Sequence, residues 1–183
     1  SLGVLGKNGR GTADHFNCTD DVDIIMGTFS KSLAAQGGFV AGEHKVIDYI
    51  RHHSRPFIFS ASLAPALIAT VDKALDIMIR EPERIENLWK ITKYAAEGFK
   101  KLGFNIGNAQ TPIIPIIIGD MELTFKFWKL IYDMGVFANC VIPPAVPENK
   151  CIIRTSYIAT HTIEQIDKAL SVFEKAGKQL GII

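Results

Sequence analysis

Hydrophobic residues recur along the chain with two different periods, and these predict alternating strands and helices. Short apolar runs of strand length occupy 22–26, 37–42, 57–59, 111–118, 136–142 and 151–156. Apolar residues spaced three and four apart predict helices with one buried face over 63–78, 85–102, 123–134 and 163–173, with a shorter helix at 46–53. Asp120 is placed to cap one helix, and Thr162 with Gln165 has the spacing of a capping box before the last. The pattern predicts an α/β protein.

Pro82 interrupts the helical pattern between the two longest helices. A proline is favoured in the first turn of a helix, so a new helix is expected to begin there. We therefore predict two domains, 1–82 and 83–183, in a chain of 183 residues that is 48% hydrophobic and can bury a substantial core.

The net charge and the cysteine content exclude several kinds of partner and of structural site. With 20 basic and 19 acidic residues the net charge is +1, which predicts no general attraction to nucleic acid or to an anionic membrane and favours a small-molecule partner. The longest apolar run, 113–118, contains Pro115 and is too short to cross a bilayer. Three cysteines without Cys-x-x-Cys spacing predict neither a zinc site nor a disulfide framework, and they fit the reducing cytoplasm.

Lys31 is the strongest candidate for chemistry. It follows an apolar strand and is surrounded by the hydroxyls of Thr28, Ser30 and Ser32. We expect a lysine at the end of a buried strand to be desolvated, which favours the neutral amine that forms a Schiff base with an aldehyde. The hydroxyls and the backbone N–H groups of the turn are expected to bind a phosphate, so the segment suits pyridoxal phosphate. The alternative is a solvated loop lysine.

Arg154 is the second candidate, since it is the lone cation within the apolar strand 151–156. A guanidinium held on a strand presents a planar fork that matches a carboxylate. The alternative is an edge-strand arginine paired with a nearby acid. The glycine-rich segment 3–11 spells no phosphate-binding loop, so we interpret it as structural, with an anion contact from Arg10 as the alternative.

Several motifs together resemble the α-oxoamine synthase family of pyridoxal-phosphate enzymes, which have the fold of type I aminotransferases. The resemblance lies in 27–32, in 37–40 and in 55–62 with Pro65, and it extends over essentially the whole chain. Relatives usually read Thr-Leu-Gly-Lys-Ala or Thr-Leu-Ser-Lys-Ala at the lysine. Thr-Phe-Ser-Lys-Ser at 28–32 is most similar to the serine palmitoyltransferase branch.

The resemblance implies a fold and a set of site residues. We expect the carboxyl-terminal part of the large domain, with a mostly parallel sheet and helices, followed by a small α+β domain. Pyridoxal phosphate would be bound by Lys31 with Thr28 and Ser30. Ser60 and Ala61 would reach across a homodimer interface to the partner subunit's cofactor phosphate, and Arg154 would hold the substrate carboxylate.

The segment that precedes Ser1 in the family carries an Asp and a His that contact the cofactor. We therefore interpret the chain as the carboxyl-terminal half of a longer enzyme and expect it to be inactive alone. From the residues alone, Ser60 and Ser62 would equally serve as caps of the next helix.

The implied reaction condenses an amino acid, L-serine, with a long-chain acyl-CoA, palmitoyl-CoA. Loss of carbon dioxide then leaves an α-amino ketone, the product of the first step of sphingolipid synthesis. Two alternatives within the family are glycine C-acetyltransferase and 8-amino-7-oxononanoate synthase. An alternative of another class is a non-catalytic subunit or dimerisation fragment.

Overall fold

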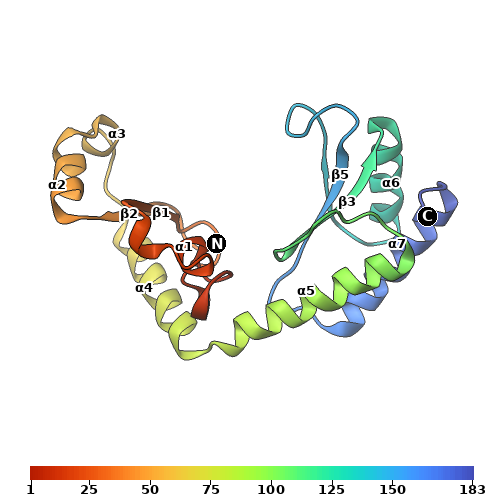
Figure 1. Cartoon of the computed structure of the whole chain (residues 1–183), viewed down its shortest axis with the longest axis horizontal. Coiled ribbons are helices and arrows are strands. Elements are labelled where there is room, and N and C mark those ends of the chain that lie inside the picture. Colours follow the sequence, from red (N-terminus) through yellow and green to blue (C-terminus); the bar gives the residue numbers. More distant parts are fainter. The chain divides into compact units, whose positions relative to one another are not determined.

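The computed structural model describes residues 1–183, which divide into two compact units, Ser1–Ile85 and Glu86–Ile183. The point of division lies between Ile85 and Glu86, in the first turn of helix α5 (Glu83–Leu102). Figure 1 labels this helix. No helix combines the length and the apolar character that crossing a membrane requires.

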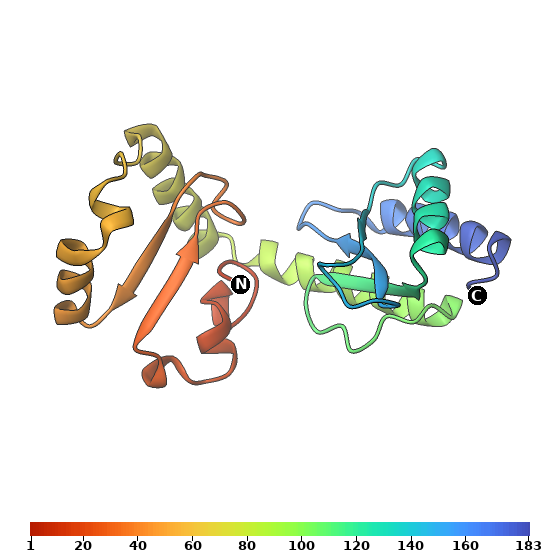
Figure 2. The same cartoon turned by 90° about the horizontal axis from the view of Figure 1, so that it is seen from above.

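The first unit is built around a two-stranded ribbon and one long helix. Strand β1 (Ile24–Thr28) pairs antiparallel with β2 (Gly38–Gly42), as Figure 2 shows. Phe29, Leu33 and Ala35, in the loop between the strands, form a small core with Val71 of α4 (Pro65–Arg80). The remaining short elements are η1 (Lys7–Gly9), α1 (Thr12–His15), η2 (Thr19–Asp21), α2 (His44–His53) and α3 (Arg55–Ile58).

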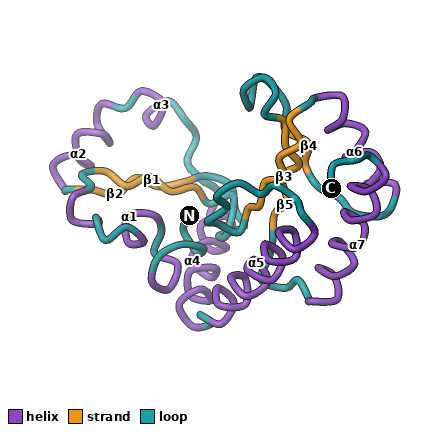
Figure 3. Tube along the Cα trace, turned by 45° about the vertical axis from the view of Figure 1, so that its right-hand side comes forward, coloured by secondary structure: helices purple, strands orange, loops and turns teal.

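The second unit packs three helices against one face of a three-stranded sheet. The sheet has the order β3-β5-β4 and both pairings are antiparallel. Figure 3 distinguishes its strands, in orange, from the helices, in purple. Its strands are β3 (Ile113–Gly119), β4 (Asn139–Val141) and β5 (Cys151–Ser156), and the helices are α5, α6 (Met121–Asp133) and α7 (Ile163–Gln179).

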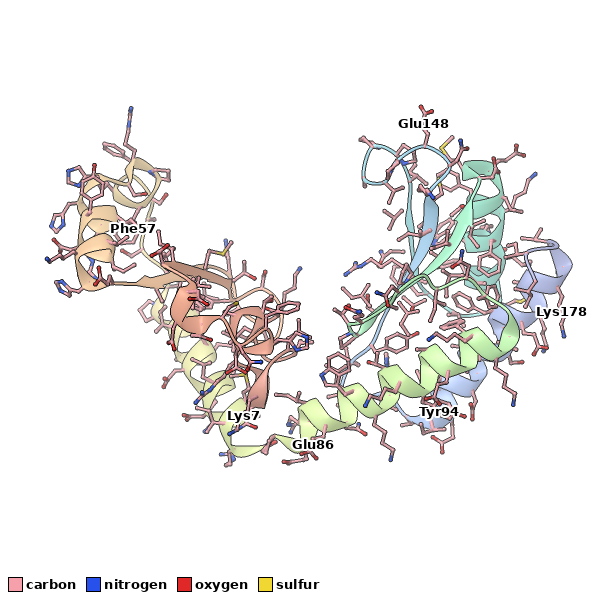
Figure 4. All side chains as sticks on the ribbon, viewed as in Figure 1. Lys7, Phe57, Glu86, Tyr94, Glu148 and Lys178 are labelled. Atoms are coloured by element: carbon pink, nitrogen blue, oxygen red, sulfur yellow. The ribbon has the colours of Figure 1, made fainter.

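The core of this unit is aromatic at its centre. Phe127 and Phe173 are fully buried, with ring centroids 5.5 Å apart, and Phe99 and Phe104 pack beside them. At the edge, Tyr94 of α5 donates a hydrogen bond to Asp167 of α7 at 2.6 Å (Figure 4). The helices are thereby fixed to one face of the sheet.

The predicted helix caps are confirmed. The Asp120 carboxylate accepts a hydrogen bond from the Leu123 backbone N–H at 2.7 Å. At α7 the Thr162 hydroxyl accepts from the Gln165 N–H at 3.3 Å, and the Gln165 side chain accepts from the Thr162 N–H at 3.0 Å. Both helices begin where the sequence predicted.

The five strands form no parallel pair, unlike the mostly parallel sheet expected for the large domain. The loop between β1 and β2 is short and turns the chain back on itself. A parallel pair requires a crossover of about a dozen residues or more. The strands that this chain contributes to the first unit therefore pair antiparallel.

The strand predicted at 57–59 is wrong, because this segment belongs to helix α3 and the turn after it. Pro56 lies in the first turn of α3, where proline favours a helix, and the Ile58 N–H donates to the Ser54 carbonyl at 2.9 Å. The Ser60 hydroxyl donates to the Pro56 carbonyl. No side chain caps α4, whose first turn begins with Pro65, so the predicted capping by Ser60 or Ser62 is also wrong.

Candidate active site

Lys31 lies near the start of the loop 29–37, which we call the Lys31 turn. Phe29 and Leu33, two residues before and after it, are 9% and 2% exposed, and both pack in the core of the first unit. The backbone closes the turn, because the Phe29 N–H donates to the Gly37 carbonyl and the Ala35 N–H to the Phe29 carbonyl, both at 2.9 Å. The two anchors point inward and the lysine between them is exposed.

Ser32 joins the Lys31 turn to the glycine-rich segment. Its hydroxyl donates to the Leu2 carbonyl at 2.7 Å. At Gly3 φ is +76°, and a Cβ there would lie 2.7 Å from Ser32 Cβ, closer than two carbon atoms can approach. Gly3 is therefore required both by its backbone conformation and by the close packing of Ser32. This supports the structural interpretation of the glycine-rich segment.

The glycine-rich segment and the Lys31 turn border one cleft of about 970 Å³. Lys31, Thr28 and Arg10 line it, so an amine, a hydroxyl and a guanidinium face the same space. Other lining residues include Thr12, Asp14, Thr19 and Asp20. No ion pair involves Arg10, which leaves its guanidinium available to an anion.

The predicted desolvation of Lys31 is wrong for this chain. Strand β1 is largely exposed, with Ile24 at 46% and Met26 at 69%, and the Lys31 side chain is exposed as well. A strand in a two-stranded ribbon has only one hydrogen-bonded neighbour, so its other edge stays open. The apolar run 22–26 was correctly predicted as a strand, but no residue of this chain covers it.

The remaining predicted phosphate ligands are divided between two places. The Ser30 hydroxyl, in the Lys31 turn, donates at 3.4 Å to the hydroxyl of Thr28, the last residue of β1, so both hydroxyls lie close to Lys31 in the chain. Ser60 and Ala61 are exposed, follow α3, and do not line the Lys31 cleft. The chain therefore brings Thr28 and Ser30 to Lys31, but not Ser60 and Ala61.

Arg154 lies on β5, the central strand of the sheet in the second unit. Alternate β5 residues, Ile153 and Thr155, point into the core, so Arg154 points to the face without helices. It is half-buried, and no ion pair or hydrogen bond involves its side chain. The alternative of an edge-strand arginine paired with an acid is therefore contradicted.

A hydroxyl pair beside Arg154 was not found from the sequence. The Thr155 hydroxyl donates to the Ile114 carbonyl at 2.9 Å, and the Tyr157 phenol donates to the Thr155 hydroxyl at 2.9 Å. Burial raises the pKa of Tyr157 to about 12, while the Thr155 contact lowers it. Tyr157 is therefore neutral at physiological pH. Nothing in the sequence pattern distinguishes this tyrosine, because the contact depends on strand pairing.

Comparison with known proteins identifies the family of this chain. The family model for aminotransferases of class I and II matches residues 3–173. A serine palmitoyltransferase from Sphingobacterium spiritivorum is 53% identical over 182 residues, covering 100% of this chain and 46% of that protein. An 8-amino-7-oxononanoate synthase from Thermoanaerobacter pseudethanolicus is 45% identical over 181 residues, covering 99% of this chain and 46% of that protein. The chain thus spans about half the length of the curated relatives it matches.

Solved structures also match over the whole of this chain. A high-resolution structure of serine palmitoyltransferase with its pyridoxal phosphate gives a TM-score of 0.95 at 34% identity, covering 100% of this chain and 46% of that chain. An 8-amino-7-oxononanoate synthase from Francisella tularensis gives a TM-score of 0.87 at 22% identity, covering 100% of this chain and 54% of that chain, a likeness in fold alone.

Proposed function

Because the chain belongs to the class I and II aminotransferase family, we propose that it is the carboxyl-terminal half of a pyridoxal-phosphate-dependent acyltransferase. The enzyme condenses L-serine with palmitoyl-CoA, releases CoA and carbon dioxide, and forms the α-amino ketone that begins sphingolipid synthesis. One observation carries the proposal: Lys31 stands on an anchored turn, at a cleft that Thr28 and Arg10 also line. Identities of 48–53% to serine palmitoyltransferases favour this choice of substrates.

The groups that line the cleft fit pyridoxal phosphate. The Lys31 amine suits the cofactor's aldehyde, and the Thr28 hydroxyl suits its phosphate. The Ser30 hydroxyl does not line the cleft itself, but it donates to the Thr28 hydroxyl and is proposed to assist it. When bound, the cofactor supplies an electron sink for the charge left on the substrate's α-carbon. The exposed position of Lys31 suits this role, because its amine can reach a group bound in the cleft.

The two candidate residues take different parts in the reaction. With cofactor and substrate bound, the Lys31 amine would be placed to take the α-proton as a general base. Arg154 holds the substrate carboxylate through its planar fork, and the absence of an acid partner leaves that fork available. The residues 1–82 then belong to the cofactor-binding large domain and 83–183 form the small domain.

The enzyme is proposed to work as a homodimer in the cytoplasm. Phe57, which lies in α3 and is labelled in Figure 4, and Phe59, which follows that helix, are 63% and 80% exposed. An exposed apolar surface of this kind suits a subunit interface. Ser60 and Ala61 would there reach the partner subunit's cofactor phosphate. The cytoplasm is a reducing compartment, in which the three cysteines would remain thiols.

Three other functions are alternatives to this one. The 8-amino-7-oxononanoate synthases at 43–45% identity favour that activity as the second candidate, and glycine C-acetyltransferase is a third member of the same family. A non-catalytic subunit is less consistent with Lys31, since a subunit without turnover does not require a lysine at a cleft.

The test is an assay of the complete enzyme that contains this chain. We expect amino-ketone product from L-serine with palmitoyl-CoA and none from glycine with acetyl-CoA. Lys31→Ala should abolish both turnover and the visible absorbance of the lysine-bound cofactor. Lys45→Ala, at an exposed lysine of α2, is the control and should change neither. Turnover with glycine and acetyl-CoA alone would refute the palmitoyltransferase assignment, and absence of the absorbance band in the unaltered enzyme would refute catalysis by Lys31.

A further inference from the structure

The sheet of the second unit has one face without helices, which we call the open face. Its side chains are mostly apolar, while the helices α5, α6 and α7 pack on the opposite face. The open face is formed by Ile113, Pro115, Ile117, Asn139, Val141, Ile152, Arg154 and Ser156. Few polar groups therefore surround Arg154, and these few are the ones that can bind a ligand together with its guanidinium.

The strand register places Asn139 directly beside Arg154. In the antiparallel pairing of β4 with β5, Asn139 is the residue opposite Arg154, and in the pairing of β3 with β5 the opposite residue is Pro115. Opposite residues share a face of the sheet, and their Cβ atoms lie about 4.5–5.5 Å apart. Proline has no polar side-chain group. Asn139 is therefore the only direct cross-strand neighbour of Arg154 that can donate or accept a hydrogen bond.

Asn139 also has a carboxamide that is not engaged elsewhere. Its side chain is exposed, and no hydrogen bond involves it. A carboxylate offers about four lone-pair positions, of which a bidentate arginine occupies two. An amide N–H beside the guanidinium can fill a third. An aspartate or glutamate in the same place would instead pair with Arg154 and compete with the substrate.

We propose that Asn139 is a second binding residue for the substrate carboxylate, donating its amide N–H to an oxygen that Arg154 also holds. This rests on the proposed function of Arg154. The amide adds directionality to the charge of the guanidinium, so the pair selects substrates that carry a carboxylate over amines that lack one. Asn139 thus contributes to the choice of an amino acid as the substrate.

The juxtaposition is tested without turnover, on the 183-residue chain. Asn139→Asp should form an ion pair with Arg154 and shift the NMR signal of the Arg154 Nε–H group. Asn149→Asp adds the same charge at an exposed loop residue outside the strand pairing, and should leave that signal in place. Equal Arg154 signals in the two variants would overturn the proposed pairing, whatever the enzyme's activity.

Binding is tested in the complete enzyme with Asn139→Leu, which removes the amide but keeps a similar volume. We expect the KM for L-serine to rise about tenfold, equivalent to about 1.4 kcal/mol, with the KM for palmitoyl-CoA unchanged. Inhibition by ethanolamine, which is serine without its carboxylate, should be unaffected. An unchanged KM for L-serine, or equal losses for L-serine and ethanolamine, would overturn the role of Asn139. Neither result would contradict the role of Lys31, because that role is tested separately by the absorbance of the bound cofactor.

Discussion

Ser32 fixes the Lys31 turn through a single hydroxyl, because its bond to the Leu2 carbonyl joins two segments that are distant in the sequence. Ser32→Ala should remove that bond and lower the free energy of unfolding of the first unit by about 1 kcal/mol. Gly3→Ala should loosen the same contact, since the added Cβ would meet Ser32 and the backbone there has positive φ. We expect faster hydrogen exchange at the amides of the Lys31 turn in both variants.

The control for this experiment is Ser30→Ala, because the Ser30 hydroxyl makes only a long, 3.4 Å bond to Thr28, which lies two residues away at the end of β1. Its effect on exchange should be small. If Ser32→Ala and Ser30→Ala had equal effects, the connection to Leu2 would not be what holds the turn in place.

At the scale of single elements, the end of β5 is held by a hydroxyl pair that responds to alkaline pH. Burial raises the pKa of Tyr157 to about 12 in the folded chain, above its ordinary value of 10.0. The neutral phenol is therefore favoured by folding, so its contribution is complete below pH 10 and is lost as the pH rises towards 12. Over this window the free energy of unfolding should fall by at most about 1.4 kcal/mol per pH unit.

Tyr157→Phe isolates this contribution from other groups that titrate in the same range. The variant should lose the hydrogen bond to Thr155 and be less stable at pH 8, while its stability should fall less steeply than that of the unaltered chain above pH 10. Denaturant unfolding at several pH values measures both effects. Parallel curves for the two proteins would contradict the assignment to Tyr157.

Elements that depend on local sequence were predicted well, and those that depend on neighbouring elements were not. The caps at Asp120 and Thr162 follow from residues within one helical turn, and both are confirmed. The segment 57–59 was wrongly predicted as a strand because its apolar run outweighed the helix-starting tendency of Pro56. Exposure of Lys31 and the position of Asn139 beside Arg154 depend on which strands pair, and periodicity does not show pairing.

From the sequence, the candidate site could be predicted only where a short motif identifies the functional residue. The match of residues 3–173 to the class I and II aminotransferase family and the TM-score of 0.95 to serine palmitoyltransferase confirm the predicted family resemblance and fold. The motif around Lys31 was sufficient to suggest a pyridoxal-phosphate enzyme. The contribution of Arg10 to the Lys31 cleft was only an alternative, because glycine spacing alone does not show where a loop folds back.

At the scale of the whole molecule, the two units have separate cores of very different size. The first has four buried apolar residues around the Lys31 turn and α4, namely Phe29, Leu33, Ala35 and Val71. The second has a much larger core that includes the aromatic cluster around Phe127. Because buried apolar area is the main favourable term in folding, we expect the second unit to be the more stable and the two to unfold in separate transitions.

Phe127→Ala tests this independence, since Phe127 is fully buried and its ring packs on Phe173. The variant should lower the free energy of unfolding of the second unit by about 3–5 kcal/mol and leave the transition of the first unit unchanged. Val71→Ala is the matched variant for the first unit. It should destabilise the first unit and leave the transition of the second unchanged, and its effect should be smaller because less volume is removed. Hydrogen exchange followed segment by segment at increasing denaturant distinguishes the two transitions. If Phe127→Ala accelerated exchange in the Lys31 turn as much as in α6, the units would unfold as one cooperative body.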